Sequence, residues 1–180
     1  GAFNVTAGGT GGSITSSAVI TMLGGSPATG AASPLAGGNG GGILFNVTNT
    51  SGTVTLAAGS SILLDGGSSN GVALAGAGGS VTINTFDQAI SVSGSLLARG
   101  GSGLAGGTGG IGGQVLANSD NNNDGLGGSI TLQTSASIDV SGGAGTLAGG
   151  PARNTGMALG FAVNFEAEGG ANPSADAGGE

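Results

Sequence analysis

Oxygen-bearing side chains are concentrated in one short stretch of the chain, Asp120-Asn121-Asn122-Asn123-Asp124-Gly125. Asp120, Asn122 and Asp124 stand at positions 1, 3 and 5 of a calcium-loop pattern, with the glycine at position 6 for the tight turn. An EF-hand carries a bidentate glutamate at position 12, but that position here is Thr131. The sequence therefore predicts either a weak Ca²⁺ site with a reduced ligand set or an Asx-rich turn that needs no metal.

Carboxylate catalysis is the second chemistry that the residue types permit. A polysaccharide lyase or hydrolase needs clustered carboxylates and a basic residue, and the candidate carboxylates are Asp65, Asp87, Asp139, Glu166 and Glu168. The chain contains no lysine, and Arg99 is the one cation near its middle. The absence of His and Cys also excludes zinc-finger, haem and iron–sulfur sites, thiol nucleophiles and Ser-His-Asp triads. We therefore expect that the protein is not an enzyme.

Charge and aromatic content exclude several classes of partner. Two Lys and Arg residues against nine Asp and Glu give a net charge of −7, which cannot neutralise a nucleic-acid backbone. Five Phe are the only aromatic residues and offer little for base stacking or for a sugar platform. No apolar run approaches the ~18 residues that span a bilayer. We expect no nucleic-acid partner and no transmembrane segment.

Hydroxyl and amide side chains give two further candidate surfaces. Thr53-Val54-Thr55 has the Thr-x-Thr arrangement of ice-binding faces, although outward strand positions favour threonine in any protein. Acceptor sequons for N-glycosylation begin at Asn4, Asn46 and Asn49. Chance matches to the sequon are expected in a chain so rich in Asn, Ser and Thr.

A fourfold internal repeat supplies the elements that must position these residues. The motif Gly-[Ser/Thr]-[Ile/Val]-Thr begins at Gly12, Gly52, Gly79 and Gly128. A second apolar run, with an isoleucine followed by glycine four residues later, is anchored at Ile20, Ile62, Ile90 and Ile138. Constant elements joined by connectors of unequal length are typical of a solenoid. We expect the apolar residues of the motif to stack as one interior ladder, made of Ile14, Val54, Val81 and Ile130.

Side-chain alternation within each repeat predicts short half-buried strands, and a quarter of the chain, 45 residues, is glycine. The connectors 24–42, 66–79, 100–113 and 142–150 read either as flexible surface loops or as ordered polyglycine-like segments packed against the coils. The predicted fold is all-β: a parallel β-helix with long Gly-rich connectors. Residues 1–168 would form a single domain of about five irregular coils, and 169–180 a tail that is flexible or captured by a partner.

At residues 128–143 the chain resembles a known repeat. Gly-Ser-Ile-Thr-Leu-Gln-Thr-Ser-Ala-Ser-Ile-Asp-Val-Ser-Gly-Gly is similar to the repeat of filamentous-haemagglutinin-type bacterial surface proteins, and residues 79–94 match it nearly as well. The resemblance extends to pectate-lyase-like solenoids and covers four short units, roughly a third of the chain. It implies a right-handed parallel β-helix in a secreted protein that serves in adhesion or in surface fibres.

The longest alternating run, residues 157–168, favours assembly. It places four apolar side chains on one face: Leu159, Phe161, Val163 and Phe165. The run would form a last coil or a capping strand that folds back and keeps the protein monomeric, or a strand suited to pair with the first coil of another copy. We therefore expect an extracellular structural protein of the cell surface, a fibre, sheath or matrix subunit that forms a homopolymer by head-to-tail stacking. The alternative is an adhesin stalk, or a module that binds surface polysaccharide. Neither needs a cofactor, and calcium is the single ion for which the sequence suggests a site.

Overall fold

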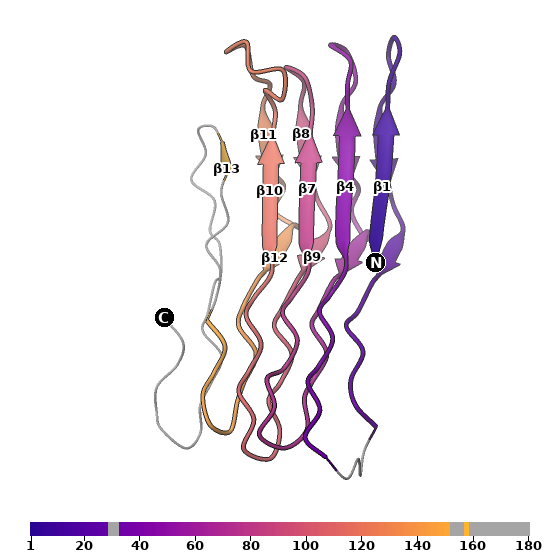
Figure 1. Cartoon of the computed structure of the whole chain (residues 1–180). Helices are drawn as coiled ribbons and strands as arrows, with labels where there is room; N and C mark the ends of the chain where they lie inside the picture. The colour runs from indigo at the N-terminus through magenta and orange to yellow at the C-terminus, as the bar shows by residue number, and fades with distance from the viewer. Residues whose placement is uncertain (29–32, 152–156, 159–180) are drawn as a thin grey trace.

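The chain folds into three parallel β-sheets (Figure 1). The computed structural model describes residues 1–28, 33–151 and 157–158. The first sheet contains β1 (Ala2–Ala7), β4 (Gly42–Val47), β7 (Ser80–Asn84), β10 (Gln114–Asn118) and β13 (Met157–Ala158). The second contains β2 (Ile14–Ser16), β5 (Val54–Leu56), β8 (Ile90–Val92) and β11 (Ile130–Leu132). The third contains β3 (Val19–Thr21), β6 (Ser61–Leu63), β9 (Ser95–Leu97) and β12 (Ser137–Asp139). The described residues include no helix.

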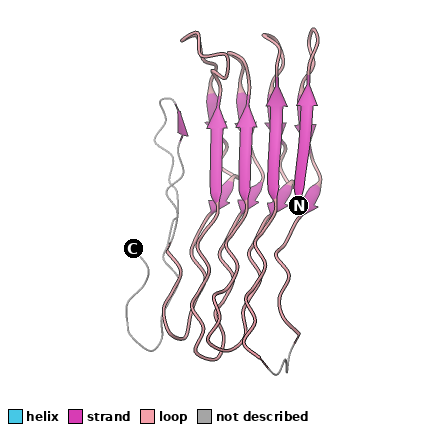
Figure 2. Ribbon diagram, viewed as in Figure 1, coloured by secondary structure: helices cyan, strands magenta, loops and turns pink. Residues whose placement is uncertain are grey.

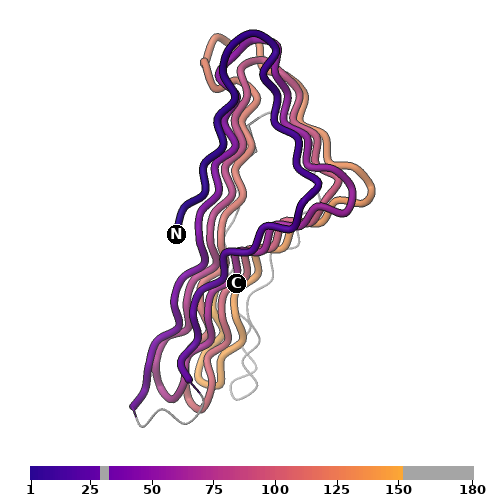
Figure 3. The backbone as a smooth tube through the Cα atoms, turned by 90° about the vertical axis from the view of Figure 1, so that its right-hand side faces the viewer, coloured from indigo at the N-terminus to yellow at the C-terminus, as the bar shows by residue number. Residues whose placement is uncertain are grey.

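Each coil contributes one strand to each sheet, so the molecule is a parallel β-solenoid, as the repeats predict. The coils β1–β3, β4–β6, β7–β9 and β10–β12 stack in sequence order, and β13 adds to the first sheet beside β10. Viewed along the stack, the three strands of a coil outline a triangular head, from which the connectors extend as a two-armed tongue (Figure 3). The expected end of the last coil and the tail 169–180 lie outside the described residues.

The interior ladder is real, but one of its four predicted members is wrong. Ile14, Val54 and Ile130 stack in the second sheet, and the third coil adds Ile90 to that ladder instead of Val81. Val81 belongs to the first sheet, where it pairs with Ile43 and with Val115. The motif at Gly79 therefore begins a strand of the first sheet. The motif does not identify the sheet, because any strand that follows a glycine corner and alternates in burial has the same short pattern.

The second apolar anchor is displaced in the same coil. Ile20, Ile62 and Ile138 occupy equivalent places in the third sheet, where the third coil contributes Leu96. Ile90, expected in that place, is the residue of the second sheet described above. In the third coil the two-part motif therefore matches the first and second strands, whereas in the other coils it matches the second and third. A repeat of two strands does not identify which two of the three strands in a coil it covers.

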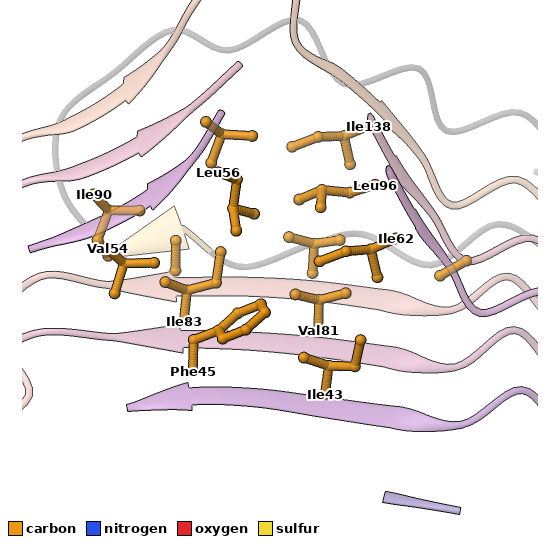
Figure 4. Close-up of a cluster of buried hydrophobic side chains, with 14 of the residues drawn as sticks. Ile43, Phe45, Val54, Leu56, Ile62, Val81, Ile83, Ile90, Leu96 and Ile138 are labelled. Atoms are coloured by element: carbon orange, nitrogen blue, oxygen red, sulfur yellow. The ribbon is translucent and has the colours of Figure 1, made fainter. Parts of the chain in front are cut away.

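Apolar side chains, mainly Ile, Val and Leu, fill the triangular head. Residues alternate between the interior and the outer face, as in β4, where Ile43, Phe45 and Val47 are buried and the residues between them are partly exposed. Side chains from all three sheets converge on this interior (Figure 4). Complete burial of one such side chain contributes ~1.5–3 kcal/mol, so the stacked ladders are the main stabilising feature of the head.

The described residues of the connectors are ordered, which favours the second of the two structures that the sequence allows. They are drawn as loops and not as strands (Figure 2). Glycine amides nevertheless link them across the tongue in one continuous chain of hydrogen bonds. The amide of Gly67 donates to the carbonyl of Gly38, and the amide of Gly76 donates to Gly67, both at 2.8 Å. The chain runs through Gly25, Gly38, Gly67, Gly76, Gly101, Gly110, Gly143 and Gly150.

Glycine is required in the tongue because neighbouring backbones occupy the space of a side chain. A Cβ atom at Gly67 would lie less than 3.0 Å from the carbonyl oxygen of Gly25 in the preceding coil. The same holds for Gly101 against Gly67 and for Gly143 against Gly101. The leucines of the connectors, by contrast, remain exposed near the tip of the tongue: Leu35, Leu74, Leu104 and Leu147.

Candidate functional site

The predicted calcium loop gains a third carboxylate from the neighbouring coil. One carboxylate oxygen from each of Asp87, Asp120 and Asp124 lies within 4.8 Å of the others. Asp87 follows β7 in the third coil, and Asp120 and Asp124 follow β10 in the fourth, so parallel stacking of these strands brings the two loops together. Oxygen ligands of this type are those that Ca²⁺ takes.

Hydrogen bonds hold the loop in its turn. The two oxygens of Asp120 accept from the amides of Asp124 and Gly125, each at 3.1 Å, and Asp124 Oδ1 accepts from the amide of Leu126 at 2.9 Å. The Asn122 amide group donates to Asp124 Oδ2 at 2.9 Å and to Asp87 Oδ2 at 3.2 Å. The side-chain nitrogen of Asn122 thus lies between the two carboxylates. To bind a cation at this point, Asn122 would have to turn its side-chain oxygen toward them instead.

The spacing of residues in the sequence did not assign Asp87 to this carboxylate cluster. The φ of Asp87, at +53°, is in the left-handed region, and its Oδ1 is buried without a hydrogen-bond partner among the described residues. Asp87 lies 33 residues before Asp120 in the sequence. A search for carboxylates separated by one coil length, after the coils had been aligned, would have found it.

The carboxylates considered for catalysis are only partly brought together. Arg99 contacts Asp65, with Nη2 2.6 Å from Oδ2, and its Nε lies 3.9 Å from Asp139 Oδ2. The hydrogen bond and the negative charges raise the pKa of Arg99 above its ordinary value. Asp65 and Asp139 therefore flank one permanent cation, which is the arrangement of a structural ion-pair ladder. Glu166 and Glu168 lie outside the described residues.

The Thr-x-Thr motif forms part of a hydroxyl row on the outer face of the second sheet. Thr15, Thr55, Ser91 and Thr131 are in register on β2, β5, β8 and β11. The parallel row, which lies two residues earlier in each coil, is interrupted at Ala89. The amide of Thr53 in this row donates to the Ser13 hydroxyl at 3.1 Å. The face is therefore an incomplete hydroxyl array.

The three sequon asparagines have different surroundings. Asn4 is exposed on β1. Asn46 is half-buried on β4, in register with Asn84 of β7, and its Oδ1 has no hydrogen-bond partner among the described residues. Asn49 donates from Nδ2 to the carbonyl of Gly12 at 2.8 Å. Asn4 is consequently the one whose side chain the fold leaves open to solvent.

Strands β1, β2 and β3 lie at one end of the described solenoid. β1, β2 and β3 are each the outermost strand of their sheet, so one backbone edge of each strand has no described neighbour. The interior ladder of the first sheet is more exposed there: Phe3 is 43% exposed, whereas Ile43, its neighbour in the same ladder, is 2% exposed. Val5 and Ile20 are only partly buried. We call this surface, made of β1–β3 and their inward side chains, the N-terminal end face.

The predicted assembly residues Leu159, Phe161, Val163 and Phe165 lie outside the described residues. Their run begins with β13, which pairs in parallel with β10 of the same chain through Ala117–Met157 and Asn118–Ala158. The start of the run thus adds a strand to its own solenoid, in keeping with the expectation of a further coil.

Among the described residues no helix is long and apolar enough to cross a membrane. A comparison of the chain with known protein families, with curated proteins and with solved structures finds no match. The likeness of residues 128–143 to filamentous-haemagglutinin-type repeats therefore remains a resemblance, and the parallel β-solenoid is the level at which the fold is established.

Proposed function

We propose that the protein is an extracellular structural protein whose solenoids stack head to tail into a fibre, sheath or matrix. The observation that carries this proposal is the N-terminal end face. Unpaired parallel edges are templates for another strand, and natural solenoids block them with capping segments, charged residues or proline. The described part of coil β1–β3 carries neither charged side chains nor proline on its strands.

Apolar burial provides the driving force for such stacking. Phe3, Val5 and Ile20 lose their remaining contact with water only if another coil covers them, as coil β4–β6 covers them from the other side. Each inner coil already demonstrates this mode of packing. A head-to-tail contact that does not close into a ring propagates as a filament.

An extracellular location and a homopolymeric partner are parts of the same proposal. The resemblance to secreted surface proteins supports the location. The absence of charged side chains from β1, β2 and β3 supports self-association, because charges on an edge strand oppose its pairing with another strand.

Electron microscopy of the purified full-length chain tests the proposal. Filaments whose length increases with protein concentration are the expected result. Discrete rods that bind immobilised glycans would instead favour the adhesin alternative, and a chain that stays monomeric at high concentration would exclude the filament.

Deletion of residues 157–180 tests the part assigned to the C-terminal run. We expect the truncated chain to lose polymerisation, since it lacks β13 and the apolar run that follows. Circular dichroism and thermal unfolding control for loss of the remaining coils. If the truncated chain folds and still polymerises, strand pairing by this segment is wrong.

A further inference from the structure

A groove of about 330 Å³ runs along the side of the solenoid, at the corner where the third sheet meets the tongue (Figure 3). This volume lies at the lower end of the range of ligand sites, ~300–1,000 Å³. Three stacked coils line the groove, so it extends ~10 Å along the stack at a spacing of ~4.8 Å per coil. We call it the neck groove, and its lining comes from equivalent segments of the coils: 65–68, 99–102 and 141–144.

The charges at the neck groove favour a neutral ligand. Arg99 lies between two carboxylates, with Nη2 2.6 Å from Asp65 Oδ2 and Nε 3.9 Å from Asp139 Oδ2. An anion in the groove would be repelled by both carboxylates, and a metal ion would be repelled by the guanidinium that stands between them. These charges therefore act on a bound molecule mainly as hydrogen-bonding groups.

Several polar groups of the neck groove keep free hydrogen-bonding capacity. Arg99 donates to Asp65 from Nε and Nη2, and among the described residues nothing accepts from Nη1. The hydroxyls of three serines in the groove likewise have no partner in the part of the chain that the structure describes: Ser68, Ser102 and Ser141. A guanidinium nitrogen only donates, whereas a hydroxyl both donates and accepts, so the groove suits a ligand that carries several hydroxyl groups.

Apolar surface lies directly beside these polar groups. Leu63 and Leu97 are in register on β6 and β9, partly exposed, one outward position before Asp65 and Arg99. Partly exposed glycines at equivalent places leave bare backbone between the polar side chains: Gly66, Gly100 and Gly142. A sugar ring has hydroxyl groups at its edge and apolar C–H groups on its face, and the neck groove offers a complementary surface to both.

We propose that the neck groove binds a neutral saccharide, either a short oligosaccharide or a segment of a longer glycan. The sugar hydroxyls accept from Arg99 Nη1 and exchange hydrogen bonds with the serine hydroxyls, and one ring face lies against Leu63 and Leu97. The site goes beyond the assembly proposed above. Because the groove opens sideways from the stack, its occupation does not depend on whether copies associate head to tail.

Saturation-transfer NMR on the full-length chain tests the proposal, with maltotriose, cellotriose and N-acetylchitotriose as neutral probes. At least one of them should receive saturation from the protein. Trigalacturonic acid, which carries carboxylates, should receive less. Absence of transfer to every neutral probe would overturn the saccharide site, and stronger transfer to the acidic probe would overturn the neutral class of ligand. The measurement works on monomers and on filaments, so its result is independent of the assembly experiment.

Two substitutions assign the binding to the neck groove. Ser102→Ala and Arg99→Gln each remove hydrogen-bonding groups, and we expect the Kd of the bound probe to rise about three- to tenfold in each. Thr55→Val removes a hydroxyl from the outer face of the second sheet and should bind as the wild type does. Melting temperatures control for folding, and if Arg99→Gln unfolds, Ser102→Ala decides. Equal affinity in Ser102→Ala, Thr55→Val and the wild type would overturn the groove as the site.

Discussion

Asp65 and Arg99 lie one coil apart and are joined through both backbone and side chain. The Arg99 amide donates to Asp65 Oδ1 at 2.9 Å, and Arg99 Nη2 donates to Asp65 Oδ2 at 2.6 Å. The contact fixes the register of the third sheet at the point where the chain leaves the head for the tongue. Among the described residues Arg99 is the only arginine, and both ion pairs that these residues form, with Asp65 and Asp139, use its side chain.

Replacement of Arg99 by Gln should weaken the solenoid only modestly. The side chain of Arg99 is 44% exposed, and solvent screens the ion pair, so we expect a loss of ~0.5–1 kcal/mol in the free energy of unfolding. The pKa of Arg99 is raised and lies far above neutral. A group with a raised pKa loses its contribution to the free energy of unfolding only when the pH rises through that pKa. The difference in the free energy of unfolding between the wild type and Arg99→Gln, measured by urea titration, should therefore be the same at neutral and at mildly alkaline pH.

Substitution of an interior glycine of the tongue should be far more costly than substitution of Gly25. In Gly101→Ala the new Cβ overlaps the carbonyl oxygen of Gly67 and forces two backbones apart. Damage of this kind breaks adjacent members of the glycine hydrogen-bond chain, and we expect a loss of several kcal/mol. Thermal unfolding of Gly101→Ala beside Gly25→Ala measures the difference. Equal melting temperatures for the two variants would show that the tongue is not packed as described.

Val81→Asp should abolish folding, although Val81 lies in a different ladder from the one that the sequence suggested. Val81 is fully buried between Ile43 and Val115, and a lone carboxylate there would lose its hydration without gaining a partner. Thr82→Asp, at the neighbouring partly exposed position, is the matched control. Circular dichroism should show β-structure for the control and not for Val81→Asp; retention of the wild-type melting temperature in Val81→Asp would refute the interior ladder.

Calcium should bind weakly at the cluster of Asp87, Asp120 and Asp124, with a Kd on the order of 10⁻⁴–10⁻³ M, as in extracellular modules. The buried, unpartnered Oδ1 of Asp87 supports a ligand at this point. Isothermal calorimetry should show a calcium heat that disappears in Asp124→Ala and in Asp87→Asn. Asp65→Asn, on another face, should retain it. If the wild type gives no such heat, the loop is an Asx turn without metal.

Alternation and repetition in the sequence were sufficient to predict the class of fold. Ile14, Val54 and Ile130 stand at the same place in their motifs and do stack, because in-register parallel pairing places equivalent inward residues of successive coils one above the other. The same local rule could not assign Val81 to its sheet. A strand of three to five residues looks alike in all three sheets, and only the pairing between coils sets the register.

The glycine connectors show the same division between local and tertiary information. The composition allows either a flexible linker or an ordered polyglycine lattice, because an isolated glycine segment has no preference that distinguishes them. Contacts between coils decide for order: Gly67 is held by Gly38 and contacted by Gly25, which are 29 and 42 residues away in the sequence. Loop length between these residues varies, so no fixed spacing reveals the contact.

The candidate site divides in the same way. The spacing of Asp120, Asn122 and Asp124 is local, and the sequence alone identified that loop as a turn with oxygen ligands. Asp87 joins it only because β7 and β10 pair in parallel, which places the loops that follow these strands side by side. The sequence by itself determined the residue types and their alternation; the stacking of coils decided which of them meet, because the sheets pair residues about one coil apart in the sequence.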